Sequence, residues 1–326
     1  MITSPHNTKV RLNRSELAVP GSRVDFFEKA ARSEADIIFL DLEDSVSINK
    51  KLSARKNVIE AVNEIDWRKK TLSIRVNSYD TEFIKEDIKE IMKNASSRLD
   101  LLMFPKVNSD QEVFKLDELI TAYEKKFKRK KAIGFEIIIE TTLGLINVNK
   151  IALASKRNES LHFGSADFAA SLGAKNASIG GINRNYGVLD NSDKKRSFFL
   201  NDMWHSALFK IVLTAHAYGL RAVDCPFGDF SDKLGFNYAA KSSYTMGFDG
   251  KMVIHPSQIT LSNKIFSPTE KEILEANQIL AQMKSAEKKG KGAIAFNGKL
   301  LDIVSIKQAQ NIVLLAGMIK NSKEGL

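Results

Sequence analysis

The sequence predicts an α/β fold, a (β/α)8 TIM barrel followed by a C-terminal helical lid module. Short apolar runs alternate with longer amphipathic segments, which is the order of a parallel β/α protein. The runs are continuously apolar, as in strands that are covered on both faces. Polar residues close them at similar intervals, because Asp44, Asn77, Lys106, Glu140 and Asp167 are 33, 29, 34 and 27 residues apart. Each interval fits one βα unit.

The predicted strands follow one another along the first 256 residues, and the first of them is the weakest. The eight are Leu17–Gly21, Ile37–Asp44, Leu72–Asn77, Leu101–Val107, Ile133–Thr141, Leu161–Asp167, Leu220–Phe227 and Lys251–Pro256. Eight such units favour a barrel over a doubly wound open sheet, which remains the alternative. No GxGxxG motif follows the first strand, as the open sheet of a dinucleotide-binding protein would have.

Segments with apolar residues three and four positions apart lie between the strands and predict helices. The clearest are Lys50–Glu64, Glu82–Ala95, Asp110–Phe127 and Asn201–Tyr218. The step from Asp167 to Asp224 is longer, 57 residues, and we interpret the Gly-rich stretch 177–199 within it as an insertion.

The end of the chain departs from the βα pattern. A predicted helix at Thr269–Lys289, a Gly-punctuated hairpin at Gly290–Leu301 and a last helix at Ile303–Lys320 form a separate module. The predicted domains are therefore a catalytic barrel over 1–265 and a lid or oligomerisation module over 266–326.

Composition is that of a soluble globular protein, with 43% hydrophobic and 27% charged residues. One cysteine, Cys225, excludes an intrachain disulfide and fits a reducing compartment. No signal peptide precedes Arg11, and the apolar run 312–319 is too short to span a membrane, so a cytoplasmic protein is expected. The net charge of +10 comes without a nucleic-acid motif, and a phosphate-bearing ligand is a candidate use for it.

Charged residues gather where the predicted strands end, which is where barrel enzymes carry their chemistry. These residues are Asp41, Glu43, Asp44, Arg75, Lys106, Glu140, Asp167, Asp224 and His255. Any one of them could be a cap or an ion-pair partner, but a ring of acids with one Arg and one Lys indicates a site. Glu140 and Asp167 close adjacent strands without a nearby His pair or Cys. This pattern favours Mg²⁺ or Mn²⁺, and a metal-free acid–base pair is the alternative.

Four features at or near the strand ends have more specific interpretations. Arg75 is a fork for a carboxylate or a stabiliser of a developing enolate. The loop from Gly164 to Asp167 can present backbone N–H groups to a substrate carboxylate. His255 is either catalytic or a buried histidine that is satisfied by the backbone, and the sequence favours the second interpretation. Cys225 has no evident base beside it and is interpreted as core.

These residues also carry a family resemblance over nearly the full chain, from about Arg11 to Ile319. RSELAVPGSR, FLDLEDSV, LSIRVN, FEIIIET and FGSADFAAS are similar to motifs of the citrate lyase beta-subunit-like aldolase superfamily. IGGIN, DMWH, DCPFGDFSD, GKMVIHPSQI and LLDIVSIKQAQ resemble its malyl-CoA lyase branch, which also acts on β-methylmalyl-CoA.

The resemblance implies a Mg²⁺-dependent carbon–carbon lyase that converts malyl-CoA or β-methylmalyl-CoA to glyoxylate and acetyl-CoA or propionyl-CoA. It implies trimers or hexamers with shared active sites. No nucleic-acid or membrane partner is expected, because no nucleic-acid motif accompanies the basic residues and no apolar run is long enough to span a bilayer. The resemblance implies that Glu140 and Asp167 bind Mg²⁺, that Glu43 and Asp44 support the metal through water, and that Arg75 contacts glyoxylate and stabilises the enolate. It implies that Asp302 reaches the site from a neighbouring subunit and takes part in proton transfer. It further implies that the CoA phosphates are bound by Arg23 and Lys29, and that the other substrate contacts are Ala166, Ile254 and His255.

Other functions remain open from the sequence. A citramalyl-CoA lyase would use the same scaffold, since its substrate differs from malyl-CoA by a single methyl group. A malyl-CoA thioesterase would also use it, since it would hydrolyse the thioester of the same substrate. A non-enzymatic RNA- or CoA-binding protein would use the positive charge, but acids at the strand ends repel phosphates.

Overall fold

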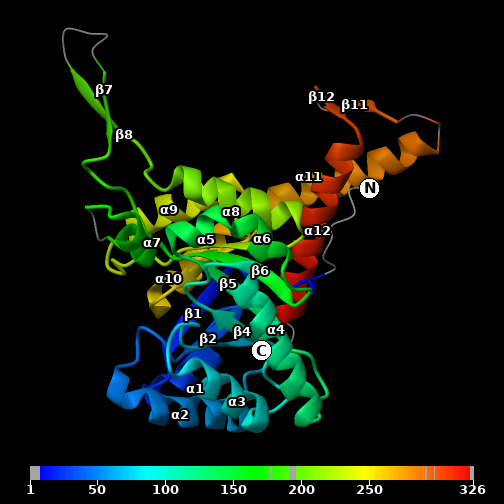
Figure 1. Ribbon diagram of the computed structural model, residues 1–326. Helices are drawn as coiled ribbons and strands as arrows, with labels where there is room; N and C mark the ends of the chain where they lie inside the picture. The colour runs from blue at the N-terminus through cyan, green and yellow to red at the C-terminus, as the bar shows by residue number, and fades with distance from the viewer. Residues whose placement is uncertain are drawn as a thin grey trace. The chain divides into compact units, whose positions relative to one another are not determined.

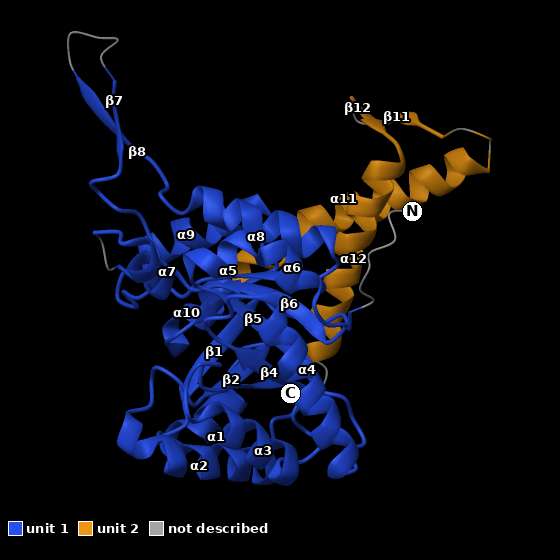
Figure 2. Cartoon of the chain, in the orientation of Figure 1, with its two compact units in different colours: residues 1–263 blue, residues 264–326 orange. Residues whose placement is uncertain are grey.

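The structure is a computed structural model that describes residues 8–323 except 176–177, 191–195, 289, 291 and 297 (Figure 1). The chain divides into two compact units, residues 1–263 and residues 264–326 (Figure 2). The N-terminal segment 1–7, on which the absence of a signal peptide depends, lies outside the described residues.

Eight parallel strands form a closed barrel in the first unit, in the order β1-β10-β9-β6-β5-β4-β3-β2 (Figure 1). The barrel closes because β1 pairs in parallel with both β2 and β10. The strands are β1 (Ser15–Pro20), β2 (Ile37–Asp41), β3 (Thr71–Arg75), β4 (Leu101–Phe104), β5 (Gly134–Ile139), β6 (Asn158–Phe163), β9 (Arg221–Asp224) and β10 (Gly250–Val253). The closed barrel confirms the predicted fold class, and the open doubly wound sheet is wrong.

The observed strands stop earlier than the predicted apolar runs. The β2 and β3 pairing ends at Asp41 and Arg75, and β5 ends one residue before Glu140. The polar residues that close the predicted runs, such as Glu43 and Asp167, lie in the loop or first helical turn that follows each strand. This places them together at the carboxyl end of the barrel.

Helices follow most of the strands and cover the barrel (Figure 1). They are α1 (Val24–Arg32), α2 (Lys51–Glu64), α3 (Ile84–Asn94), α4 (Asp110–Lys126), α5 (Thr142–Ile146), α6 (Val148–Leu153), α7 (Ser165–Leu172), α8 (His205–Ala217), α9 (Lys233–Met246) and α10 (Pro256–Ile265), with a 3-10 turn at Ile48–Lys50. The four helices that the sequence predicts most clearly are α2, α3, α4 and α8, and all four are confirmed.

The predicted insertion between β6 and β9 contains an antiparallel hairpin. Its strands are β7 (Gly187–Asp190) and β8 (Ser197–Leu200), and they pair from Gly187 with Leu200 to Asp190 with Ser197. Ala177 and residues 191–195 of the predicted insertion lie outside the described residues.

The barrel interior is layered, because every second residue of a strand points inward. On β5 and just beyond it, Glu136, Ile138 and Glu140 follow one another on the same face. Ile138 belongs to an apolar layer with Phe39, Met103, Val223 and Met252. This layer separates a polar group at the amino end of the barrel from the polar residues at the carboxyl end.

The polar group at the amino end consists of Glu16, Glu136 and His162. A carboxylate oxygen of each glutamate and a ring nitrogen of His162 lie within 4.8 Å of one another. Arg221 Nη2 lies 3.5 Å from Glu136 Oε1 and supplies the opposite charge. Burial raises the pKa of Glu16, and the charge of Glu136 raises it further. Burial also acts to raise the pKa of Glu136, but His162 and Arg221 outweigh it and lower that pKa to about 2. This ion network has its own guanidinium and belongs to the core.

Replacing Arg221 by methionine is expected to lower the free energy of unfolding by about 3–5 kcal/mol, because it leaves a buried carboxylate without its counter-charge. Urea unfolding followed by circular dichroism measures the change. Arg32→Met is the matched control, because Arg32 pairs with Glu28 on the exposed face of α1, 3.4 Å apart. The control should change stability by less than about 1 kcal/mol. Equal effects of the two substitutions would contradict the assignment of Arg221 to the core network.

The second unit is a helix, a hairpin and a helix, as the sequence predicts. Its elements are α11 (Glu270–Glu287), β11 (Ile294–Phe296), β12 (Lys299–Leu301) and α12 (Ile303–Lys323). A capping box between Thr269 and Glu272 starts α11. Residues 289, 291 and 297 of the predicted hairpin region lie outside the described residues.

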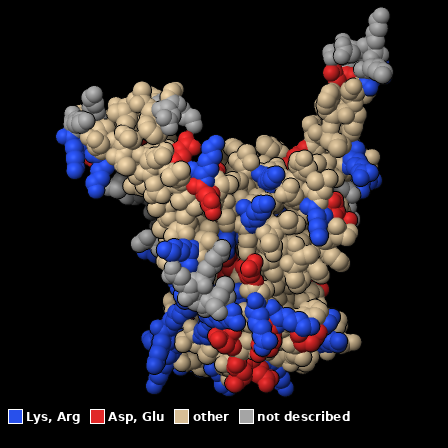
Figure 3. Space-filling view, turned by 180° about the vertical axis from the view of Figure 1, so that it is seen from behind, with Lys and Arg blue, Asp and Glu red and all other residues tan. Residues whose placement is uncertain are grey.

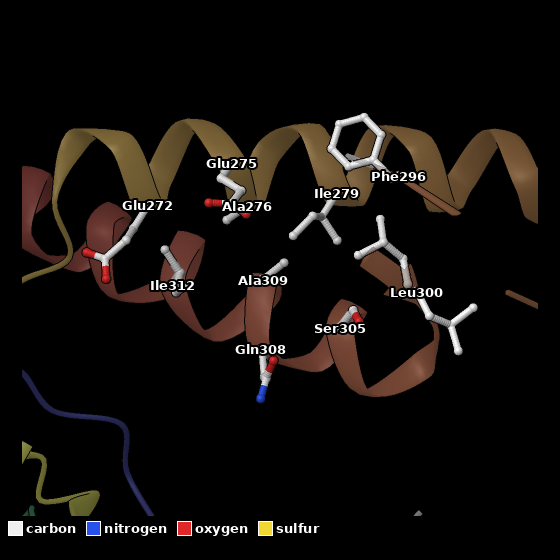
Figure 4. Close-up of a pocket in the computed structure, with 11 residues that line it drawn as sticks. Glu272, Glu275, Ala276, Ile279, Phe296, Leu300, Ser305, Gln308, Ala309 and Ile312 are labelled. Carbon is white, nitrogen blue, oxygen red and sulfur yellow. The ribbon is translucent and has the colours of Figure 1, made fainter. Parts of the chain in front are cut away.

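A pocket of about 240 Å³ lies between the two helices of this unit and the hairpin (Figure 4). Ala276, Ile279, Phe296, Leu300 and Ile312 give it a largely apolar lining, with Glu272 and Glu275 at its edge. None of the candidate site residues lines this pocket, so we interpret it as part of the seam between α11 and α12.

Two features of the described structure concern nucleic-acid and membrane partners. On the face drawn in Figure 3, Lys and Arg side chains lie among Asp and Glu side chains rather than in one continuous basic stripe. Across the described part of the chain, no helix has both the length and the apolar composition that a membrane crossing requires.

Candidate active site

The candidate site lies at the carboxyl end of the barrel, where successive strands bring distant residues together. Arg75 ends β3, Lys106 follows β4, Glu140 follows β5, and Asp167 lies in the first turn of α7 after β6. Glu43 follows β2 and completes the group. Ion pairs and charge effects connect all five, so the structure brings these predicted residues together.

Glu140 is the buried carboxylate at the centre of this group, with only 3% of its surface exposed. Its Oε1 accepts a hydrogen bond from the main-chain N–H of Lys106 at 2.8 Å. Its Oε2 lies against Gly164, where an added Cβ would come within 2.2 Å of it. Only glycine leaves space at this position for the Glu140 side chain.

The ionised form of Glu140 is unfavourable in its buried position. Burial raises the pKa of Glu140 to about 8, and the nearby charges of Asp167 and Glu43 act in the same direction. Lys106 and Arg75 only partly offset this rise. A divalent cation would stabilise the ionised form.

Asp167 is more open than Glu140, with 36% of its side chain exposed. Its Oδ1 lies 3.4 Å from the ammonium nitrogen of Lys106. Oxygen donors from a buried carboxylate and a half-exposed carboxylate fit a hard divalent cation that keeps several waters. The residues present therefore fit Mg²⁺ or Mn²⁺.

Arg75 is held by Asp41, a partner that the sequence analysis did not assign to it. Arg75 Nε lies 2.6 Å from Asp41 Oδ1, and Arg75 Nη2 lies 2.8 Å from Asp41 Oδ2. The N–H groups of Glu43 and Ser45 also donate to this carboxylate. Burial acts to raise the pKa of Asp41, but Arg75 outweighs it and lowers that pKa. Asp41 therefore fixes the plane of the guanidinium.

The pairing of Asp41 with Arg75 had a detectable signal. The two residues end adjacent strands and are register partners in the sheet. A carboxylate and a guanidinium that end neighbouring parallel strands are placed to meet on the same side of the sheet.

Glu43 and Asp44 lie in the loop after β2 and differ in exposure. Glu43 is buried, and its Oε2 lies 3.1 Å from Arg75 Nη1. Burial raises the pKa of Glu43 to about 7, while Arg75 and Lys106 oppose the rise. Asp44 is exposed, and both of its carboxylate oxygens lie 3.3 Å from the ammonium nitrogen of Lys106.

Arg23 and Lys29 lie in the loop after β1 and on α1, also at the carboxyl end of the barrel. The guanidinium of Arg23 lies 3.9 Å from the centre of the Phe26 ring, and the Lys29 ammonium lies 5.5 Å from it. Arg23 also pairs with Asp25 at 2.9 Å on the exposed surface. The structure thus gathers two exposed cations around one aromatic ring.

The remaining predicted contacts lie after β6 and β10. Ala166 is in the first turn of α7, next to Asp167. The main-chain N–H of Ile254 donates to Gln258 Oε1 at 2.9 Å, and the Ile254 side chain is exposed. His255 stacks on Phe230 with ring centres 4.6 Å apart.

Two non-catalytic interpretations from the sequence can be compared with the structure. The prediction of a buried His255 is wrong, because the ring is half-buried, but the expected contact with the backbone is present. The Nδ1 atom of His255 accepts a hydrogen bond from the main-chain N–H of Ser257 at 3.2 Å and also pairs with Ser257 Oγ at 2.9 Å. The interpretation of Cys225 as core is confirmed, since the residue is buried and forms no disulfide. Burial raises the pKa of its thiol to about 12.

Asp302 precedes α12 in the second unit and caps that helix. Its Oδ1 accepts hydrogen bonds from the N–H groups of Val304 at 2.9 Å and Ser305 at 3.2 Å. The first turn of α12 carries the exposed apolar residues Ile303 and Val304.

Comparison with known proteins gives one family. Residues 14–256 match the model of the family described as HpcH/HpaI aldolase/citrate lyase. The chain is 46% identical over 309 residues to the L-malyl-CoA/beta-methylmalyl-CoA lyase of Cereibacter sphaeroides, covering 95% of this chain and 96% of that protein. It is 33% identical over 318 residues to the malyl-CoA/beta-methylmalyl-CoA/citramalyl-CoA lyase of Chloroflexus aurantiacus, covering 97% of this chain and 86% of that one.

The fold is also that of a solved structure. CitE from Mycobacterium tuberculosis, in complex with magnesium, acetoacetate and coenzyme A, superposes with a TM-score of 0.70 at 24% identity. The match covers 94% of this chain and 98% of that chain.

Proposed function

Because the chain belongs to the HpcH/HpaI aldolase/citrate lyase family, we propose that it is a carbon–carbon lyase that cleaves malyl-CoA, β-methylmalyl-CoA or both, reversibly, with Mg²⁺. The products are glyoxylate and acetyl-CoA or propionyl-CoA. The likeness to the Cereibacter sphaeroides lyase over 95% of the chain supports the substrate class. The observation that carries the chemistry is the convergence of Glu140, Asp167 and Arg75 at one end of the barrel.

Glu140 and Asp167 are the residues that would hold Mg²⁺ or Mn²⁺. When bound, the cation lowers the pKa of the substrate hydroxyl and attracts the oxygens of the glyoxylate unit. Glu43 and Asp44 lie beside the two ligands and would support the cation through water, as acceptors at the edge of its shell.

The reaction moves electrons from the broken bond to the thioester. The hydroxyl loses its proton and becomes the aldehyde of glyoxylate, while the electrons of the carbon–carbon bond enter the enolate of the acyl-CoA. Negative charge builds on the thioester oxygen, and Arg75 is the cation that would stabilise it. The Asp41 carboxylate accepts hydrogen bonds from Arg75 Nε and Nη2, so the guanidinium is oriented before the negative charge develops on the substrate.

A proton must then reach the enolate carbon, and we assign this step to Asp302. In the reverse direction Asp302 would remove the proton from acetyl-CoA or propionyl-CoA. Asp302 would come from a neighbouring subunit of a trimer or hexamer. The exposed apolar residues that follow it, Ile303 and Val304, support a contact surface between subunits.

The CoA part of the substrate would lie over the loop after β1. Arg23 and Lys29 are exposed cations at the carboxyl end of the barrel and would bind its phosphates. Ala166, in the first turn of α7, and Ile254 and His255, in the loop after β10, lie at the same end and would contact the acyl part. The one described cysteine is buried and unpaired, which supports a reducing compartment and the expected cytoplasmic location.

One assay tests the function. Purified protein is incubated with Mg²⁺, glyoxylate and either acetyl-CoA or propionyl-CoA, and the products are identified by mass. Formation of malyl-CoA or β-methylmalyl-CoA supports the lyase, and pyruvate in place of glyoxylate tests citramalyl-CoA formation. Release of free malate and free CoA thiol from malyl-CoA, without glyoxylate, would identify a thioesterase instead.

Replacing Arg75 by lysine is expected to lower kcat/KM by about two to three orders of magnitude, the scale of one lost preorganised oxyanion donor. Lysine keeps the charge but cannot make the two-nitrogen contact with Asp41. Steady-state kinetics with saturating Mg²⁺ measures the change. Arg157→Lys is the control, because Arg157 pairs with Asp117 and Glu124 outside this site. Activity of Arg75→Lys within a few-fold of wild type would leave Arg75 as a structural ion-pair partner only.

A further inference from the structure

Lys106 contacts both of the carboxylates that we assign to the metal. Its main-chain N–H donates to Glu140 Oε1 at 2.8 Å. Its ammonium nitrogen lies 3.4 Å from Asp167 Oδ1. One residue therefore binds a carboxylate after β5 and a carboxylate in α7 through two different groups.

The backbone of Lys106 is unusual in a way that permits both contacts. Its φ is 53°, in the left-handed region that residues with a Cβ avoid. Among the described residues, the other non-glycine positions with positive φ are Arg68 and Lys128, which are exposed in turns. Lys106 is half-buried at the end of a barrel strand. A strained conformation at this place indicates that the surrounding contacts stabilise it.

The ammonium group of Lys106 has acidic neighbours on several sides. It pairs with Glu43 Oε1 and with both carboxylate oxygens of Asp44, in addition to Asp167. Burial acts to lower the pKa of Lys106, but Glu140 and Glu43 outweigh it and raise that pKa, so the group is charged. The positive charge of Lys106 thus lies among the carboxylates that would surround a metal ion.

We propose that Lys106 is a positioning residue of the metal centre, which gathers its carboxylates in the metal-free protein and holds down their affinity for the divalent cation. The proposal rests on the proposed metal site. The N–H group orients Glu140, and the ammonium neutralises part of the charge that would otherwise separate Asp167, Asp44 and Glu43. A cation that binds Asp167 must compete with this ammonium and is repelled by it. Weak binding allows the cation to dissociate from the free protein and to bind again together with the substrate.

The test is the affinity for Mn²⁺ without substrate, measured at pH 8 by the electron paramagnetic resonance signal of the free ion. Lys106→Met keeps most of the length of the side chain and removes its charge. We expect this variant to bind Mn²⁺ about tenfold more tightly than wild type. Lys106→Gly adopts the left-handed conformation without cost and should also bind more tightly. Lys106→Arg keeps the charge and should stay within about threefold of wild type.

Lys51→Met is the matched control. The Lys51 ammonium donates to the carbonyl oxygens of Leu42 and Glu43, each at 2.7 Å, so it lies by the same loop without a contact to a metal ligand. Its loss should change the Mn²⁺ affinity by less than about threefold. Lys106→Met and Lys106→Gly affinities equal to or weaker than that of Lys51→Met would overturn the proposal.

The result separates this proposal from the proposed function. Wild-type protein that does not bind Mn²⁺, or binding that survives Glu140→Gln, would remove the metal centre itself and the role of Lys106 with it. Because no substrate is present, a failure of the lyase assay leaves the order of Mn²⁺ affinities readable.

Discussion

Glu140→Gln is expected to lower kcat/KM by at least about 10³-fold while it stabilises the metal-free protein at high pH. Activity falls because the amide cannot provide the charged oxygen that a hard cation prefers. Steady-state kinetics with excess Mg²⁺ measures the first effect. Wild-type enzyme should lose activity in the same way when chelator removes the metal, and added Mg²⁺ or Mn²⁺ should restore it.

The stability effect follows from the raised pKa of Glu140, about 8 in the folded protein against a usual value of 4.5. A carboxyl group with a higher pKa in the folded state holds its proton more tightly there than in the unfolded chain. The free energy of unfolding of the metal-free protein therefore decreases as pH rises from about 4.5 to about 8. Glutamine does not titrate and removes this loss.

Thermal unfolding with chelator present, at pH 6 and pH 9, measures the difference between wild type and Glu140→Gln. The advantage of the variant should be larger at pH 9. Glu118→Gln, at an exposed position of α4, is the control and should show no such advantage. A metal-free Glu140→Gln protein that is less stable than wild type at pH 9 would contradict the energetic cost assigned to this buried carboxylate.

The barrel could be predicted from sequence because each of its requirements leaves a local signal. Strands that are buried on both faces give continuous apolar runs, and each βα unit has a similar length. The residues that follow the runs, such as Glu140 and Asp167, meet in space because parallel strands end at the same edge. The site was therefore predictable as a group of residues.

The contacts within the site were less predictable, because they depend on geometry that spacing does not contain. The pairing of Arg75 with Asp41 depends on the register of two strands. The double contact of Lys106 depends on a left-handed backbone that follows a proline and has no glycine or asparagine to indicate it. Glu136 lies within an apolar run, and its carboxylate is buried beside Arg221 and His162. Only closure of the barrel brings these partners together.

Asp302→Asn is expected to lower kcat by about 10²–10⁴-fold, the usual contribution of a general acid or base. Asparagine caps a helix as well as aspartate does, so it should preserve the bonds to the N–H groups of Val304 and Ser305. It cannot transfer a proton at neutral pH. A large loss of activity at unchanged thermal stability would therefore separate proton transfer from capping, and wild-type activity would leave Asp302 as a cap only.

Mixed oligomers then test whether Asp302 acts on a neighbouring subunit. Asp302→Asn and Glu140→Gln subunits with different tags are refolded together, and particles that carry both tags are isolated. If Asp302 acts between subunits, about a quarter of the sites in a random mixture combine an intact barrel with an intact Asp302, and activity partly returns. Refolding Glu140→Gln with Arg75→Lys is the control, since both changes lie in the barrel of one subunit and no such combination arises. Mixed particles without recovered activity would place Asp302 at the site of its own subunit, because in that arrangement every site lacks either the metal ligand or the proton donor.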